Sequence, residues 1–236
     1  MSASDPQPTD RAIGEVHGAI IQQLLATGYA PNRFQLASEL QIPIEDVESR
    51  LRRLADTHGI VLHPHEPETW VAHPFSTTPT LHWIDGETRS WWAPCVWCAL
   101  GIATLASGFV QIHTRLGAES KPIVIDVEGG HPTSKTDNLV VHFSVPPKFA
   151  WDNVHKHCAL VLPFESEEDV VRWCEAYGQS VGEIVPLRQV AHLARLWYRT
   201  YANSDWKKWS VLQAQEIFRS VGLTSQFWQL EGHGTY

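Results

Sequence analysis

The sequence predicts an α+β protein, with an N-terminal three-helix module followed by a mixed or antiparallel sheet with packed helices. Two patterns predict this fold class. Apolar residues recur at helical spacing in the first part of the chain, and short β-branched segments bounded by Gly, Pro or Asn follow in the middle. With 236 residues, 43% of them hydrophobic, the chain is long enough for one large domain or two smaller ones.

The N-terminal module has the pattern of a winged helix. Three helices are predicted over 12–28, 32–40 and 44–54, and a small hairpin over 59–72. Arg50, Arg52 and Arg53 fall on the helix that would read DNA, but acidic residues flank them and leave the segment acidic. Because DNA binding depends on phosphate contacts, we favour a packing role for this module over a DNA-binding one.

The sheet and the C-terminal helices follow a boundary near residue 75, where Pro and Ser/Thr residues cluster. Strands are predicted over 80–84, 109–116, 123–127, 139–145 and 159–162, and a helix capped by Ser166 follows them. Amphipathic segments over 187–201 and 210–221 predict two further helices. We expect four regions: a disordered tail (1–11), a winged-helix-like domain (12–75), a core (76–185) and a helical extension (186–236).

The composition restricts the partners and the compartment. The formal net charge of -8 argues against nucleic acid or an anionic membrane as a partner. No apolar run is long enough to span a bilayer, and the N-terminal segment lacks the features of a signal peptide. We therefore expect a cytoplasmic protein whose four cysteines are reduced, so that thiol or metal chemistry is favoured over disulfides.

The segment 91–105 is central to the prediction. Pro94 suits the first position of a helix, and no charged residue occurs from Val96 to Ala106, so the helix is expected to be buried on all sides. Cys95 and Cys98 lie on one face near its N-terminus, where the helix dipole favours a thiolate. These sulfurs are either small apolar filler or part of a soft-metal site.

The second cysteine region, 148–164, contains His155, His157 and Cys158. A structural zinc site needs four ligands, and Cys95, Cys98, Cys158 and one of the histidines are enough to supply them. Since the chain has no second Cys-x-x-Cys pair, zinc remains a minority interpretation. Cys174 is expected to be a core residue.

The combination of the two cysteine regions is more specific. Trp97-Cys98-Ala99-Leu100 is followed 60 residues later by Cys158, then by a strand ending at Phe164 and a helix reaching Trp173. This arrangement resembles the organomercurial (alkylmercury) lyase family, which also carries an N-terminal winged-helix-like module. The resemblance covers roughly residues 15–180 and is sharpest around the two cysteines.

The resemblance implies a specific chemistry. The essential cysteines of the family fall on Cys98 and Cys158, whose thiolates bind the mercury of R–Hg⁺ and push electron density onto its carbon. An acid then protonates that carbon, which releases the hydrocarbon and leaves Hg(II) on sulfur. The resemblance implies no organic cofactor, with Hg(II) as the substrate and product metal. The implied partners are a small organometallic or soft-metal ligand and cellular thiols.

One position departs from the family pattern. The family usually carries an Asp three residues after the first cysteine, where this chain has Gly101. Cys95, His157 and Asp152 are candidate proton donors in its place. We expect Cys98, Cys158 and Cys95 to be catalytic, with the same cysteines and His157 as metal ligands, and the Cys98 and Cys158 sulfurs about 4–6 Å apart, a span that Hg²⁺ can bridge.

Two other functions stay open. A diverged relative would bind a soft metal, or catalyse another thiol-dependent reaction, without cleaving carbon–mercury bonds. A weaker alternative is a winged-helix regulator that senses metals or thiols.

Overall fold

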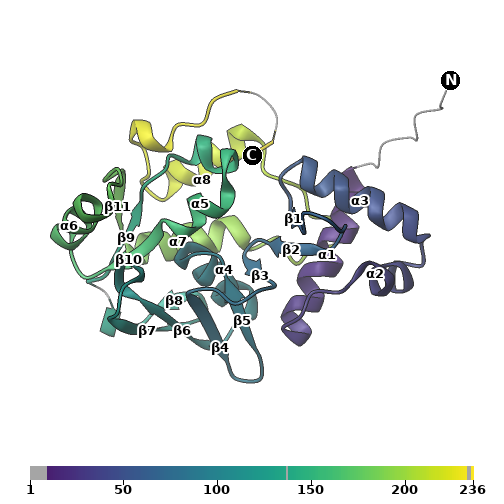
Figure 1. Cartoon of the computed structure of the whole chain (residues 1–236), viewed down its shortest axis with the longest axis horizontal. Coiled ribbons are helices and arrows are strands. Elements are labelled where there is room, and N and C mark those ends of the chain that lie inside the picture. Colours follow the sequence, from purple (N-terminus) through teal and green to yellow (C-terminus); the bar gives the residue numbers. More distant parts are fainter. Residues whose placement is uncertain (1–9, 137, 233–234) are drawn as a thin grey trace.

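A computed structural model of the chain describes residues 10–136, 138–232 and 235–236. It confirms the predicted α+β fold, and its strand pairs are antiparallel. Figure 1 shows the N-terminal helices at one side of the molecule, with β1 and β2 of the larger sheet beside them, and the other strands and helices toward the opposite side. The helices are α1 (Asp10–Thr27), α2 (Arg33–Leu40), α3 (Ile44–Asp56), α4 (Val96–Ala106), α5 (Val154–Ala159), α6 (Glu167–Tyr177), α7 (Leu187–Tyr198) and α8 (Val211–Ser220).

The strands form two sheets. The larger has the order β1-β2-β3-β5-β4-β6-β7-β8, and the smaller has the order β10-β9-β11. Their bounds are β1 (Val61–Leu62), β2 (Thr69–Ala72), β3 (Phe75–Ser76), β4 (His82–Gly86), β5 (Ser90–Ala93), β6 (Phe109–Arg115), β7 (Pro122–Glu128), β8 (His131–Pro132), β9 (Val140–Phe143), β10 (Val161–Phe164) and β11 (Glu183–Pro186).

The N-terminal module is joined to the rest of the molecule through the larger sheet. Its helix α2 begins with a capping box between Asn32 and Gln35, and α3 buries Val47, Leu51 and Leu54. Strand β1 then pairs with β2, β2 pairs with β3, and β3 pairs with β5. One continuous sheet therefore crosses the sequence position at which we expected a boundary.

Helix α4 lies at the centre of the fold. It packs against α7 and against β4, β5 and β6, and Figure 1 shows it between the sheet and the C-terminal helices. Residues from Val96 to Ala103 are buried, as expected for a segment without charges. The C-terminal segment also docks on this body, because Trp228 is buried against Phe143 and Phe218.

Three local predictions need correction. Pro94 is not the first residue of α4, because the N-cap is Cys95 and Pro94 precedes it. Cys158 does not enter a strand; it lies on the short helix α5, and the strand begins at Val161. Helix α1 begins at Asp10, so the last two residues of the expected tail are helical, and residues 1–9 lie outside the described part of the chain. No helix among the described residues is long and apolar enough to cross a membrane.

A buried histidine makes the fold sensitive to acid. The His17 ring is fully buried and stacks on Trp206 with ring centroids 3.6 Å apart, and neither ring nitrogen has a hydrogen-bond partner among the described residues. Burial, with a smaller contribution from nearby His73, lowers the pKa of His17 from 6.5 to about 3. The folded protein therefore holds this ring neutral, whereas the unfolded chain protonates it below about pH 6.5.

We predict a loss of stability between pH 6.5 and 3 because the unfolded state binds the extra proton. His17 alone contributes a loss of about 2 kcal/mol at pH 5 relative to pH 7. Urea unfolding of wild type and His17→Phe at both pH values measures this contribution. The variant should lose correspondingly less stability on acidification, and an equal loss in both proteins contradicts the prediction.

Candidate active site

The N-terminus of α4 places two sulfurs next to each other. Cys95 is the N-cap residue, and its Sγ accepts a hydrogen bond from the backbone N–H of Cys98 at 3.3 Å. The side-chain oxygen of Ser, Thr, Asp or Asn ordinarily accepts this N-cap hydrogen bond. A negative charge on the sulfur would in addition interact favourably with the helix dipole. Both side chains are about 1% exposed.

The third sulfur comes from α5. Asn153 caps this helix by accepting the N–H of Lys156, and Cys158 follows on its last turn. The Cys158 Sγ and the Cys98 Sγ lie within 4.8 Å of each other. The two cysteines therefore converge as expected, with their sulfurs no more than 4.8 Å apart, although 60 residues separate them in the chain.

His73 joins these sulfurs and was missed in the sequence. One of its ring nitrogens, Cys98 Sγ and Cys158 Sγ form a group whose members lie within 4.8 Å of one another, and Nε2 lies 3.7 Å from Cys158 Sγ. Burial lowers the pKa of His73 to about 4, so its ring is a neutral nitrogen donor at pH 7. No metal-binding spacing marks this residue; its only sequence signal is its place in a Pro-rich stretch between the module and the core.

The three sulfurs differ in their protonation. Burial alone would raise the pKa of Cys95, but hydrogen bonds from the Cys158 and Cys98 thiols and from the Cys98 N–H outweigh it, so this pKa is well below the usual range. Burial and the neighbouring Cys158 and Cys95 raise the pKa of Cys98. The hydrogen bond to Cys95 also raises the pKa of Cys158. Among the three sulfurs, Cys95 is therefore the one whose surroundings favour the thiolate, whereas those of Cys98 and Cys158 favour the thiol.

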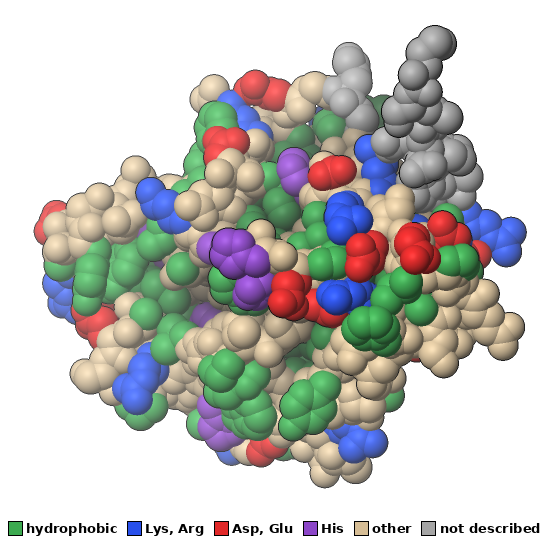
Figure 2. Space-filling view, turned by 45° about the vertical axis from the view of Figure 1, so that its right-hand side comes forward, with side chains coloured by type: hydrophobic (Ala, Val, Ile, Leu, Met, Phe, Trp, Pro, Cys, Tyr) green, Lys and Arg blue, Asp and Glu red, His purple; other side chains and the backbone are tan. Residues whose placement is uncertain are grey.

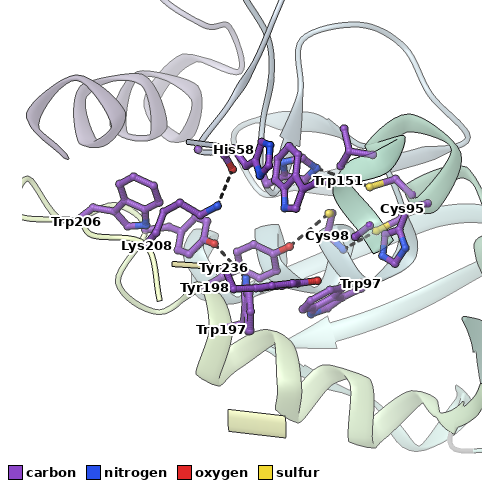
Figure 3. A pocket seen from close by; sticks show the side chains of 17 residues that line it. His58, Cys95, Trp97, Cys98, Trp151, Trp197, Tyr198, Trp206, Lys208 and Tyr236 are labelled. Atoms are coloured by element: carbon purple, nitrogen blue, oxygen red, sulfur yellow. Dashed lines mark hydrogen bonds between the residues drawn. The ribbon is translucent and has the colours of Figure 1, made fainter. Parts of the chain in front are cut away.

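These sulfurs line a cavity of about 70 Å³, shown in Figure 3. Its walls are mainly aromatic, with rings from Trp97, Trp151, Trp197, Tyr198, Tyr201 and Trp206. Cys158 and His73 also line a second, larger cavity of about 390 Å³. The sulfurs are therefore buried but border open space, which suits a small apolar substrate.

Lys208 is a basic group on the wall of the first cavity. Its Nζ donates to the carbonyl oxygens of Thr57 at 2.8 Å and His58 at 3.3 Å, and it lies 5.3 Å from the centre of the Trp151 ring. Burial lowers its pKa to about 8. Lys208 thereby ties the N-terminal module to the C-terminal segment beside the cavity.

The other predicted residues lie in different places. His157 is buried, lines the first cavity and leaves Nδ1 without a hydrogen-bond partner among the described residues, but it is outside the group formed by His73 and the sulfurs. Asp152 is exposed and does not line this cavity. Cys174 is buried in a separate cluster, where its Sγ lies 3.6 Å from His142 Nε2.

Position 101 lacks an acid, and the structure gives a steric reason. A Cβ atom added to Gly101 would lie 2.4 Å from Cδ2 of Tyr198, which is too close for a real contact. The Tyr198 ring, from helix α7, therefore occupies the space beside residue 101. Its hydroxyl oxygen lies 3.4 Å from Cys98 Sγ (Figure 3).

Comparisons with known proteins agree with this geometry. The chain resembles the crystal structure of the mercury-bound form of MerB2, with a TM-score of 0.61 and 22% sequence identity over 83% of this chain and 90% of that one; at this identity the likeness concerns the fold. No curated protein matches the chain. Residues 75–199 match the family model for alkylmercury lyase, MerB, and this segment is more than half of the chain and contains all three converging cysteines. The chain therefore belongs to the alkylmercury lyase family.

Proposed function

We propose that this protein cleaves the carbon–mercury bond of organomercurials by protonolysis, with Cys98 and Cys158 as the mercury ligands. The observation that carries the proposal is the convergence of these two sulfurs and His73 within 4.8 Å, at the wall of an apolar cavity. Membership of the alkylmercury lyase family supports the reaction class.

The spacing of the sulfurs fits a bridging soft metal. Two metal–sulfur bonds of about 2.3 Å each span at most about 4.6 Å, and the two sulfurs lie within 4.8 Å of each other, so one metal ion is able to contact both. Thiolates are the ligands that soft metals prefer, and the carbon of R–Hg⁺ gains electron density as each thiolate binds. A proton delivered to that carbon then breaks the bond, giving R–H and leaving Hg(II) on the two sulfurs.

Cys95 and His73 have supporting roles in this proposal. Cys98 and Cys158 must lose their protons to bind mercury, and hydrogen bonds from both thiols to Cys95 lower the pKa of Cys95. Cys95 is thus placed to take up one of these protons. His73 offers a neutral nitrogen to the mercury beside Cys158. His157, within the same cavity, remains a further candidate ligand.

The expected partners follow from the reaction. Cellular thiols are needed to remove Hg(II) from the cysteines, and we propose a cytoplasmic protein that needs no organic cofactor. An excess of thiol in the assay plays the same part as the cellular pool.

Hydrocarbon release tests the proposal directly. Purified protein, given methylmercury or phenylmercury with excess thiol, should release methane or benzene over many turnovers. Headspace gas chromatography measures the product, and protein denatured before mixing gives the background rate. Mercury bound in stoichiometric amount without any hydrocarbon released contradicts lyase activity.

That contrary result would favour the second candidate function, soft-metal binding without turnover. Gly101 is the observation in favour of this candidate, because glycine has no side chain to donate a proton. The sulfur geometry alone supports binding equally well, so product release is the measurement that separates the two functions.

The structure gives less support to the regulator alternative. Arg50 pairs with Glu15 at 3.4 Å, and Arg52 pairs with Glu48 at 3.0 Å. Figure 2 shows lysine and arginine side chains lying among acidic ones on the visible face rather than in a continuous basic patch. This distribution supports a packing role for the module, since DNA binding needs unpaired basic groups facing the phosphates.

A further inference from the structure

We propose that Tyr198 delivers the proton to the carbon of the bound organomercurial, in place of a side chain at position 101. The proposal rests on the function proposed above and names a catalytic residue for it. Tyr198 lies on the last turn of α7, and none of the sequence patterns singled it out.

The first support is steric. Helices α4 and α7 approach so closely that the Tyr198 ring lies on the backbone of Gly101, where an added Cβ would come within 2.4 Å of Cδ2 and 2.6 Å of Cε2. Glycine at position 101 is thus the condition for placing this ring next to α4. The lack of an acidic side chain at position 101 and the presence of the Tyr198 phenol beside it therefore have the same steric cause.

The second support is the position of the hydroxyl group. The Tyr198 oxygen lies 3.4 Å from Cys98 Sγ, which is one of the two proposed mercury ligands. The ring is held in place by Tyr201 and Trp97, with centroids 4.9 and 6.0 Å away, and the residue is 2% exposed. A carbon attached to mercury on Cys98 therefore lies near a fixed O–H donor that faces the same cavity.

The bonds formed and broken in this step balance when the cellular thiols that remove Hg(II) are included. The O–H bond of Tyr198 breaks, its proton forms a C–H bond with the electron pair of the carbon–mercury bond, and Hg(II) stays on Cys98 and Cys158. The resulting phenolate takes a proton from one incoming thiol. The thiolate formed and a second thiol then replace Cys98 and Cys158 on Hg(II), and the proton of the second thiol returns to one of these cysteines while the other is left as a thiolate. No oxidant or reductant takes part.

Other groups in the cavity compete for this role, and one of them, His157, lies outside the group formed by His73 and the two ligand cysteines. The Cys95 sulfur is turned toward the helix terminus, where it accepts the Cys98 N–H at 3.3 Å. His73 Nε2 belongs to the group of atoms that faces the mercury as a ligand. Tyr198 is the hydroxyl donor that contacts a ligand sulfur without being a ligand, so geometry favours it.

The test uses Tyr198→Phe, which keeps the ring and removes only the hydroxyl group. We expect it to bind phenylmercury with the stoichiometry of wild type but to release benzene about 10²–10⁴-fold more slowly in single turnovers. The matched control is Tyr177→Phe, because Tyr177 does not line the cavity and its hydroxyl donates a hydrogen bond to Glu119 Oε1 at 3.3 Å instead. That control should change the rate less than about threefold, which is below the loss expected for a proton donor.

A donor exchange separates a chemical role from a structural one. Gly101→Asp with Tyr198→Ala should recover benzene release relative to Tyr198→Ala alone, because a carboxyl group then has room beside Cys98. Unchanged release in Tyr198→Phe overturns the assignment while leaving lyase activity in place, and loss of release confined to Cys95→Ser would transfer the role to Cys95. Absence of benzene from wild type itself would overturn the proposed function instead.

Discussion

Replacing Cys98 or Cys158 with serine is expected to slow hydrocarbon release by on the order of 10³-fold or more, because each variant leaves mercury with one thiolate in the pair. A serine hydroxyl is a hard oxygen donor of similar size, so the cavity keeps its shape while the electron donation to carbon is lost. Mercury retained after gel filtration with a dilute thiol should fall as well. Headspace analysis and mercury quantification on the same samples measure both effects.

Cys174→Ser is the matched control for these variants. Cys174 is also buried, at 2% exposure, but it packs beside His142 in a separate hydrophobic cluster. The control should retain the wild-type rate of release and the wild-type mercury stoichiometry, because it removes a buried thiol outside the site. Turnover that survives in either Cys98→Ser or Cys158→Ser contradicts the proposed pair of ligands.

The predicted features with local causes agree well with the structure. The uncharged run after Cys95 is the buried helix α4, and Ser166 caps α6 with its side chain on the Asp169 N–H. The strands bounded by Gly and Pro also occur, within a few residues of their predicted ends. Each depends on side-chain periodicity or on a short-range hydrogen bond, which neighbouring residues determine.

The prediction that Cys98 and Cys158 converge had a different basis. Spacing alone left both apolar filler and a metal site open, with a zinc site the minority interpretation, and the family resemblance selected the pair. His73 lies outside both cysteine regions in the sequence. It reaches the sulfurs only because β2 and β3, on either side of it, pair within the larger sheet. Such a long-range contact leaves no periodic signal near the residue itself.

The protonation of Cys95 also depends on this tertiary contact. From the sequence, Cys95 was a candidate proton donor, since an isolated thiol is largely protonated at pH 7. In the folded chain, the thiols of Cys158 and Cys98 donate to it and lower its pKa. Because a lowered pKa leaves Cys95 protonated less often, it disfavours the donor role, and this direction could not be inferred before Cys158 was placed beside Cys95.

The contact between Gly101 and Tyr198 can be measured by its effect on stability. Gly101→Ala places a methyl group where the Tyr198 ring lies, so it should destabilise the protein by about 1–3 kcal/mol, although Ala is otherwise preferred over Gly within a helix. Tyr198→Ala should cost about 3–5 kcal/mol through the cavity that it leaves. Urea unfolding of both variants and of the double variant measures these free energies.

The double variant decides whether the two residues share one space. With the ring gone, the methyl group introduced at position 101 no longer clashes, so the double variant should be more stable than the sum of the single losses predicts, by about 1–3 kcal/mol. Gly101→Ala combined with Tyr177→Ala provides the comparison, because Tyr177 stacks on Trp173 in helix α6. The free-energy losses of these two substitutions should add to within about 0.5 kcal/mol. Additive losses at Gly101 and Tyr198 would mean that the ring does not exclude a side chain at position 101, and the steric reason for the missing acid would then fail.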